Sequence, residues 1–492
     1  MRCSITRLGY AVVGLFFAGV LYEALLHSTF LILVPFATSL FLLVYIHKPS
    51  VRRLVHRRFL IVWIIVLLVT RLGFFVMYLG YGRVTWDLTD VFYSQAKSVL
   101  QGKLPNIGFP THYSQYFPYL LGIPVALVDD PYSLVVYFAA FDVLVGVGIW
   151  RIAGRIAKKS AGNLALQELP RTAVMLYILC PASFYVTIFW NQQEVVTAFL
   201  LLLLAYAYIA LERRPDRLLV VVPLAMAAAF AMSYLLVCVG LFGISMLFYD
   251  PELKRKLILR SGAVVLALYL PFLLMGVSFR PVIEEFGYGA IGNNPFAVLE
   301  AFSLKVGPLP YVALGAAFVL VYFAVTDGRT GYERAGLPVI CIPLLAYLMF
   351  MTLSKKSVSF YSVVFLPFLA VFVAAKPKLA DLYVIYGLAN TFASHFADKP
   401  NLDALVRLLP VGAGMGRAIV LAFMAAIILM IVAIQLAFIR ELLRPYWSSL
   451  IGLRPSRMLR FYASQLRSLL GLGKAAGEPR ANANGPAPRT TH

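Results

Sequence analysis

Residues 85–124, TWDLTDVFYSQAKSVLQGKLPNIGFPTHYSQYFPYLLGIP, lie between two long apolar runs. They contain the carboxylates Asp87 and Asp90, together with His112, several tyrosines and several prolines. Charged groups next to apolar spans are informative, because placing a charge at the centre of the lipid costs about 2.5–3.5 kcal/mol. The segment is therefore either a site for chemistry next to a membrane or a hydrated loop with an amphipathic helix on the membrane surface.

The composition is that of a membrane protein. The 492 residues are 61% hydrophobic and 13% charged, whereas soluble domains are about half apolar and about a quarter charged. The net charge of +21 comes from short basic clusters between apolar runs. Such clusters are typical of cytoplasmic loops and argue against a nucleic-acid partner. The four cysteines show no spacing typical of a zinc site or a disulfide framework.

Apolar runs that approach the roughly 20 residues of a membrane-spanning helix occur along most of the chain. They predict an all-α, polytopic membrane protein with about 12–14 transmembrane helices. The predicted spans are 8–26, 30–46, 59–79, 132–150, 172–190, 195–211, 218–248, 257–275, 306–325, 337–353, 358–374, 382–396 and 418–439. The run 218–248 is long enough for a tilted helix or for a hairpin broken near Ser233. The run 119–128 is too short to cross.

Lysine and arginine predict which loops face the cytoplasm. The basic loops are 48–58, 151–159, 213–217, 254–256, 329–334, 376–378 and the tail after residue 440. The alternate loops then face outward, namely 80–118, 191–194, 278–305, 354–357 and 397–412. The more suggestive carboxylates lie in these outward loops. Transporters more often have ionisable groups at mid-membrane, so the pattern favours chemistry at the external face.

Three regions follow from this pattern. Residues 1–58 are expected to form two N-terminal transmembrane helices and a basic inner loop. Residues 59–440 are expected to form the transmembrane domain that carries the candidate site, with a large first outer loop. Residues 441–492 are a basic cytoplasmic tail. Within the tail, 454–473 has the pattern of an amphipathic helix on the inner leaflet, and the composition of 473–492 is typical of disorder.

Asp87 and Asp90 directly follow a predicted span, so the backbone can hold them at the interface. A carboxylate there is a candidate general base for an acceptor hydroxyl. The alternative is that each caps a helix, since Asp is a favoured N-cap. Asn191-Gln-Gln-Glu194 joins two spans by a tight turn. Glu194 either orients a substrate or pairs with a cation, or the turn is an ordinary solvated loop.

Lys355 and Lys356 depart from the positive-inside pattern, because they lie in an outward loop at the mouth of a span. Two lysines there favour an anion, such as a lipid-linked phosphate, or they contact ordinary headgroups. Tyr361 would lie one turn inside the span. No histidine has metal-ligand spacing, and His112 is the one retained as a candidate substrate-binding residue.

The order of these motifs resembles the GT-C glycosyltransferases, and within them the glycosylphosphatidylinositol first-mannosyltransferase branch and its prokaryotic relatives. The family's first loop runs through an acidic cluster, a helix and a Tyr-x-Tyr-x-Pro-Leu-Leu segment. The corresponding residues here are Asp87-Leu-Thr-Asp90, Val91-Phe92 to Pro105, and Tyr113-Ser-Gln-Tyr116-Phe-Pro118-Tyr-Leu-Leu121. The turn at Glu194 and the segment from Lys355 to Tyr361, followed by Pro367, are similar to later family motifs.

The resemblance implies a membrane enzyme that transfers a sugar, with mannose expected, from a polyprenyl-phosphate donor to a lipid or glycan hydroxyl. Asp87 or Asp90 would be the base, and Lys355 or Lys356 with Tyr361 would lie near the phosphate. Glu194, His112 and Tyr116 are further candidates for substrate binding. The implied partners are the donor, the acceptor and membrane lipids, while no cofactor is certain and use of a divalent metal stays open. The alternative function is a lipid-linked intermediate flippase or a non-catalytic membrane scaffold.

Overall fold

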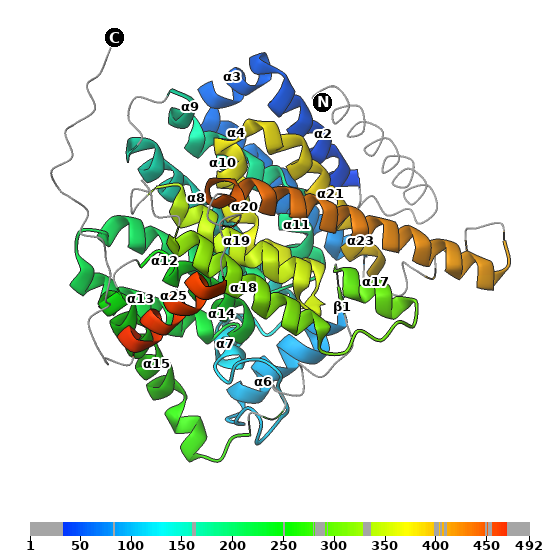
Figure 1. The fold of residues 1–492 in the computed structure, drawn as a ribbon. Coiled ribbons are helices and arrows are strands. Elements are labelled where there is room, and N and C mark those ends of the chain that lie inside the picture. Colours follow the sequence, from blue (N-terminus) through cyan, green and yellow to red (C-terminus); the bar gives the residue numbers. More distant parts are fainter. Residues whose placement is uncertain are drawn as a thin grey trace, which may run out of the picture.

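A computed structural model of the chain describes residues 33–81, 84–159, 164–248, 251–278, 280, 291–292, 294–327, 336–397, 403, 406–407, 411–447, 450 and 455–469. These residues form a bundle of helices, joined by one short pairing of two-residue strands (Figure 1). The expected all-α class is therefore confirmed for the described residues. The likeness to the GT-C arrangement stays a prediction.

The elements follow the chain in this order. The first half contains α2 (Leu33–His47), α3 (Pro49–Arg57), α4 (Phe59–Leu67), η2 (Leu68–Gly73), α5 (Phe74–Tyr81), η3 (Asp87–Tyr93), α6 (Ser94–Leu100), α7 (Phe117–Leu127), α8 (Tyr132–Lys159), α9 (Leu164–Gln167), α10 (Leu169–Leu179), α11 (Pro181–Phe184), η4 (Tyr185–Phe189), α12 (Glu194–Leu211), α13 (Pro215–Phe230) and α14 (Tyr234–Ser245). The second half contains α15 (Pro251–Leu274), β1 (Ile291–Gly292), α17 (Pro295–Ala301), α18 (Leu309–Asp327), α19 (Pro338–Leu353), β2 (Lys356–Ser357), η6 (Ser359–Tyr361), α20 (Ser362–Ala375), η7 (Pro377–Leu379), α21 (Ala380–Ala397), α23 (Ala413–Leu443), η8 (Arg444–Tyr446) and α25 (Pro455–Leu469).

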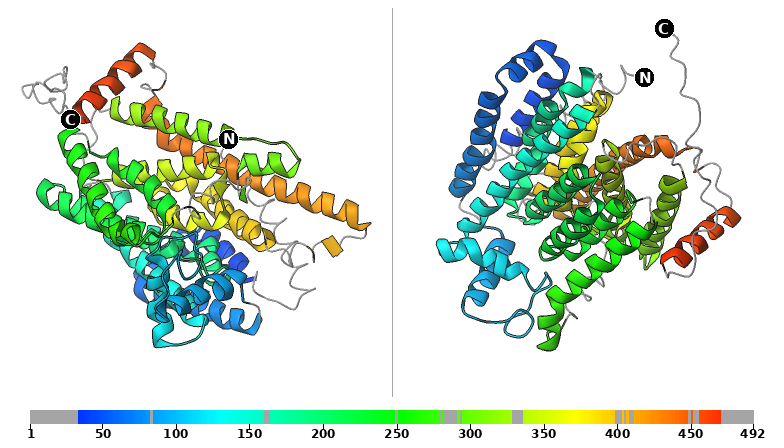
Figure 2. Two further views of the ribbon diagram at one scale, coloured as in Figure 1. Left: turned by 90° about the horizontal axis from the view of Figure 1, so that it is seen from below. Right: turned by 90° about the vertical axis from the view of Figure 1, so that its left-hand side faces the viewer.

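Helices α19 and α20 lie at the centre of the bundle (Figure 1). Every residue of α20 from Ser362 to Ala374 is buried, and α10, α12 and α19 pack around it. A helix that is apolar all round is typical of the interior of a large or membrane-embedded protein. Helices α15 and α18, in contrast, lie at the periphery (Figure 2). They expose large apolar side chains such as Leu274 and Val312. An apolar outer surface of this kind is expected where helices contact lipid.

Six of the described helices are long and apolar enough to cross a membrane, and up to eight segments qualify if each of two bent helix pairs is one span. The chain is therefore a multi-pass membrane protein. Helices α7, α14 and α19, and the η6–α20 segment, are apolar but shorter. The predicted span 8–26 lies outside the described residues, so the expected total of about 12–14 spans stays a prediction.

Two helix pairs are bent beside a proline. The run 172–190 was expected to be one span, but α10 and the α11–η4 segment meet at an angle of 56°. The bent pair still qualifies as one broken span. The bend occurs at Pro181, which has no N–H with which to continue the hydrogen bonds of α10. Helices α2 and α3 meet at 101° next to Pro49. Part of the predicted basic inner loop is therefore helical.

The long run 218–248 consists of two helices, α13 and α14, joined at residues 231–233. Of the two alternatives for this run, the break near Ser233 is confirmed and the single tilted helix is wrong. The run 119–128 lies almost wholly in α7, which has 11 residues and contains Pro124. It is therefore short, as expected.

Helix α25 confirms the helix expected within 454–473. It packs on α15 and α18, where the Tyr462 hydroxyl donates a hydrogen bond of 2.5 Å to the carbonyl oxygen of Val319, and Phe461 packs edge-on against Phe323. Its predicted position on the inner leaflet and the three predicted regions stay predictions. The tail 473–492 lies outside the described residues.

Glycine allows α14 to approach α19 closely. A Cβ atom added at Gly243 would lie 2.6 Å from the Cα atom of Pro343, and one at Gly240 would lie 2.5 Å from the Tyr347 hydroxyl. Backbone cannot yield as a flexible side chain does, so the contact at Gly243 is the stricter of the two. In contrast, nothing lies within 4 Å of a Cβ added at Gly262 on the peripheral helix α15.

The variant Gly243→Ala is therefore expected to lower the thermal unfolding midpoint of the detergent-solubilised protein. Overpacking a filled interior costs about 1–3 kcal/mol. The matched variant Gly262→Ala is expected to leave the midpoint unchanged or to raise it, because alanine favours helix more than glycine does. Equal midpoints for the two variants would contradict the close packing of α14 on α19.

Candidate functional site

The turn 191–194 joins η4 to α12 and is buried. Its four polar side chains are each exposed by 2% or less, so the alternative of a solvated loop is wrong. The amide nitrogen Nδ2 of Asn191 donates to the Tyr78 hydroxyl at 3.0 Å and to Thr85 Oγ1 at 2.9 Å. Asn191 has φ of 55°, a region that Asn enters more readily than most residues. The turn is thus hydrogen-bonded to Thr85 at the start of segment 85–124.

Asp87 is held by the same turn. It begins η3 and is half-buried, and Gln192 Nε2 donates a hydrogen bond of 2.9 Å to its Oδ2. The N-cap position of η3 belongs to Trp86, so the helix-cap alternative for Asp87 is wrong. Burial raises the pKa of the Asp87 carboxyl above its ordinary value, and the bond from Gln192 opposes this rise. A raised pKa makes a carboxylate a better proton acceptor.

A cavity of about 340 Å³ lies beside Asp87. Its volume is at the lower end of the range of about 300–1,000 Å³ that is usual for small-molecule sites. The candidate residues on its walls are Asp87, His112, Glu194, Lys356 and Tyr361. These residues come from distant parts of the sequence, so the fold gathers them at one cavity.

Glu194 begins α12 and lines this cavity while being only 2% exposed. Its Oε2 atom, like Oε1 of Gln193, has no hydrogen-bond partner among the described residues. A buried acceptor without a donor costs about 1–3 kcal/mol. A ligand that brings hydroxyl protons or positive charge would therefore be stabilised at this wall.

Lys356 reaches the cavity from a short parallel strand pair. In this pair, β2 carries Lys356 opposite Ile291 of β1. Asn294 fastens the pair, because its Nδ2 donates to Ser357 Oγ at 3.0 Å and its Oδ1 accepts from the backbone N–H of Ala297 at 2.9 Å. Lys356 is 8% exposed. An ammonium group with so little access to water is well suited to binding an anion.

Three candidate residues lie elsewhere. Asp90 is exposed on η3. Lys355 forms an ion pair with Glu300, with 3.7 Å between Nζ and Oε1. The Tyr116 hydroxyl donates to the carbonyl oxygen of Leu268 at 2.6 Å, and its ring packs edge-on against Phe272. The structure therefore separates the paired alternatives, because Asp87 and Lys356 line the cavity while Asp90 and Lys355 do not.

No protein family, curated protein or solved structure matches this chain. A function for the cavity must therefore be argued from its residues. The groups available are a carboxylate with a raised pKa at Asp87, a second buried carboxylate at Glu194, a nearly buried ammonium at Lys356, and the ring nitrogens of His112. Together they can accept a proton, donate hydrogen bonds and stabilise an anion.

The described part of the chain contains no group of three or more His, Cys, Asp or Glu side chains that could hold a metal ion. Asp87 and Glu194 share the cavity and lie close enough for their charges to repel.

Sequence reasoning missed Gln192 as the residue that holds Asp87, and it assigned no role to the polar residues at the α13–α14 break. Ser233 and Tyr234 at that break line the cavity. The sequence does contain a clue to Gln192 and to the polar residues at the break. Both groups lie in short polar breaks between apolar runs, and such breaks can meet at one end of a bundle. The pairing of β1 with the strand that carries Lys356 could not be predicted, because a strand of two residues is too short to show an alternating pattern in the sequence.

Proposed function

We propose that this protein is a membrane glycosyltransferase. It transfers a sugar, expected to be mannose, from a polyprenyl-phosphate donor to a hydroxyl group of a lipid or glycan acceptor at the outer membrane face. The observation that supports the proposal is that Asp87 and Lys356 line one cavity together with Glu194. Transfer from a phosphate donor needs both a proton acceptor and a group that stabilises the departing anion.

In the proposed reaction, the Asp87 carboxylate takes the proton from the acceptor hydroxyl. The hydroxyl oxygen forms a bond to the anomeric carbon as the bond from that carbon to the phosphate oxygen breaks. The phosphate oxygen leaves with the electron pair, and direct displacement inverts the anomeric centre. Lys356 stabilises the charge on the departing phosphate, an effect that is strong where water is largely excluded.

The other cavity residues bind and orient the substrates. The unpartnered Oε2 of Glu194 accepts a hydrogen bond from a sugar hydroxyl, which removes the cost of leaving that oxygen unsatisfied. His112 and Tyr361 line the same cavity, and in this proposal they bind the phosphate and the sugar. Gln192 keeps the Asp87 carboxylate oriented towards the acceptor.

The proposal is tested with the purified full chain in liposomes, supplied with radiolabelled polyprenyl-phosphate mannose and a crude lipid acceptor pool. Transfer of label to an acceptor is expected. A parallel measurement follows binding of unlabelled polyprenyl phosphate. Binding without transfer would point to a wrong sugar or acceptor. The absence of both binding and transfer would overturn the proposal.

The rate of transfer is expected to fall as the pH falls. The base must be deprotonated, and burial raises the pKa of Asp87 in the folded protein. The acid limb of kcat/KM is therefore expected above the ordinary aspartate value of 3.8, with full activity at higher pH. The profile is measured in liposomes that remain intact over the pH range. An acid limb at or below the ordinary aspartate value would contradict the assignment of Asp87.

A further inference from the structure

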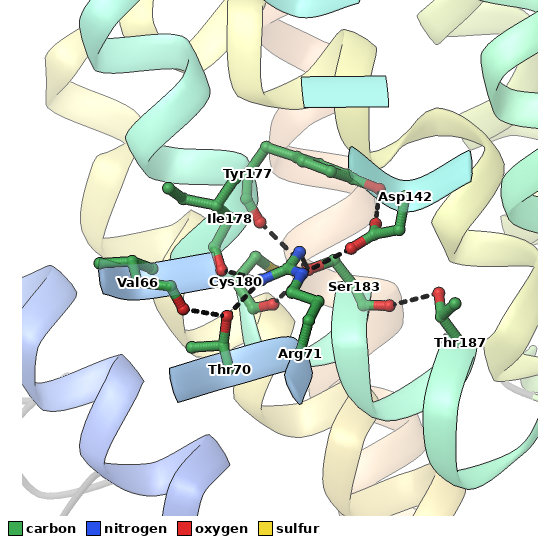
Figure 3. A network of polar contacts seen from close by, with 9 residues as sticks. All are labelled: Val66, Thr70, Arg71, Asp142, Tyr177, Ile178, Cys180, Ser183 and Thr187. Atoms are coloured by element: carbon green, nitrogen blue, oxygen red, sulfur yellow. Dashed lines mark hydrogen bonds and ion pairs between the residues drawn. The ribbon is translucent and has the colours of Figure 1, made fainter. Parts of the chain in front are cut away.

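A buried ion pair lies among the helices, outside the set of residues that line the cavity. Arg71 is 5% exposed on η2, Asp142 is 1% exposed on α8, and Arg71 Nε donates to Asp142 Oδ2 at 2.6 Å. The Tyr177 hydroxyl donates to the other oxygen of Asp142. Figure 3 shows the guanidinium of Arg71 pointing between Asp142 and the chain around Ser183. Neither member of the pair lines the cavity.

The rest of the Arg71 guanidinium binds the break between α10 and α11. Its Nη1 donates to the carbonyl oxygen of Ile178 and its Nη2 donates to Ser183 Oγ at 3.0 Å. The Ser183 hydroxyl in turn lies 2.8 Å from the carbonyl oxygen of Cys180. Carbonyl groups at the end of a helix lack intrahelical donors, and within a membrane water cannot replace them. Arg71 and Ser183 together cap the broken helix.

The direction in which the chain leaves this break determines where the turn 191–194 lies. After Pro181 the chain runs through α11 and η4 to Asn191. The helix that carries Arg71 ends near Tyr78, and Asn191 donates to the Tyr78 hydroxyl. The same two segments are thus joined twice, by the bond from Arg71 to Ser183 and by the bond from Asn191 to Tyr78. The turn then holds Asp87 through Gln192.

We propose that Arg71 and Asp142 are positioning residues for the site. Their network fixes the angle between α10 and α11, and through it the contact of Gln192 with Asp87. This inference rests on the proposed function for its effect on catalysis, but the effect on the turn is independent of any activity. Buried charges of this kind are also found in transporters. Here, however, the pair is occupied within the protein, because Asp142 binds Arg71 and Tyr177, and the guanidinium also binds Thr70, Ile178 and Ser183.

The test uses the full chain in liposomes with the variant Arg71→Lys. Lysine keeps the charge opposite Asp142 but lacks the planar fork that reaches Ile178 and Ser183 at the same time. Hydrogen exchange of the backbone amides at 191–194 and 85–93 is measured by mass spectrometry. Exchange at both segments is expected to rise at least about tenfold, while exchange in the central helix α20 stays unchanged.

The matched control is Lys254→Arg, which exchanges a nearly buried cation that hydrogen-bonds Tyr322 far from the turn. It is expected to leave exchange at 191–194 unchanged. Where wild type transfers sugar, Arg71→Lys is expected to lower kcat on the order of tenfold with little change in KM, since misplacing a reacting group costs rate. The acid limb is expected to move to higher pH, because Asp87 loses the bond that lowers its pKa.

Unchanged exchange at the turn in a folded Arg71→Lys variant would overturn the inference. Ser183→Ala removes one arm of the cap without altering any charge, and it carries the same test if Arg71→Lys does not fold. A wild type that neither binds polyprenyl phosphate nor transfers sugar would overturn the proposed function. The positioning role would still be decided by the exchange at 191–194.

Discussion

The variant Asp87→Asn is expected to lower the rate of sugar transfer about a thousandfold while the protein stays folded. A positioned general base contributes about 10²–10⁴-fold, and an amide cannot take its place. Asparagine still offers an oxygen to Gln192, so the cavity keeps its shape. Burial raises the pKa of Asp87, so its folded-state contribution to stability is lost as the pH rises through that pKa. At neutral pH the variant is therefore expected to melt at the same temperature as wild type or higher.

The measurement is the initial rate of transfer from radiolabelled polyprenyl-phosphate mannose in liposomes, with thermal melts in parallel. Asp90→Asn is the matched control, because it makes the same chemical change on the exposed side of the same π-helical turn. It is expected to transfer at close to the wild-type rate. Loss of activity in the control alone would identify Asp90 as the base. Normal rates in both variants would move the base elsewhere, with Glu194 the next candidate.

The variant Lys356→Met is expected to lower kcat/KM by about tenfold to a hundredfold and to weaken binding of polyprenyl phosphate. A hydrogen bond to a charged group is worth about 1.5–3 kcal/mol, and each 1.4 kcal/mol is a factor of ten. Methionine fills a similar volume, so the pairing of β2 with β1 is expected to persist. Binding is measured with a sugar-free polyprenyl phosphate and again with the corresponding polyprenol, which lacks the phosphate.

Lys355→Met is the control for that experiment. Lys355 is the neighbouring lysine, but it pairs with Glu300 and does not line the cavity. Its replacement is expected to change binding by no more than about twofold, because Lys355 does not line the cavity and its charge is already paired with Glu300. A loss at Lys355 equal to that at Lys356 would mean that the two lysines attract the phosphate only through their total charge.

The general plan of the molecule could be predicted from the sequence because long apolar runs have few alternatives to helix. The break near Ser233 was also predictable, since a single upright helix cannot use so many apolar residues within one bilayer. The bend at Pro181 was harder to foresee. A proline inside an apolar run is compatible with a straight or a kinked span, and the guanidinium that stabilises the bend comes from a distant residue, Arg71.

The candidate site could be predicted only as a set of alternatives. The sequence places Asp87 and Asp90 one turn apart, and Lys355 and Lys356 side by side, so topology cannot distinguish the members of either pair. The distinction depends on contacts with Gln192 and with β1, which are formed by segments distant in the chain. Tyr116 had the right position in a motif, but its hydroxyl is used by the carbonyl oxygen of Leu268.

The ion pair of Arg71 and Asp142 also bears on how the protein is assembled during its synthesis. Each charge enters the bilayer on a separate span, and each costs about 2.5–3.5 kcal/mol to insert near the centre of the membrane. The cost falls only when the two spans meet, so residues 59–80 and 132–159 are expected to associate soon after insertion. When α10 and α11 are inserted next, Arg71 is already in place to donate to the free carbonyl oxygen of Ile178 at their break. These first two partners are therefore expected to act as the nucleus on which the later spans assemble.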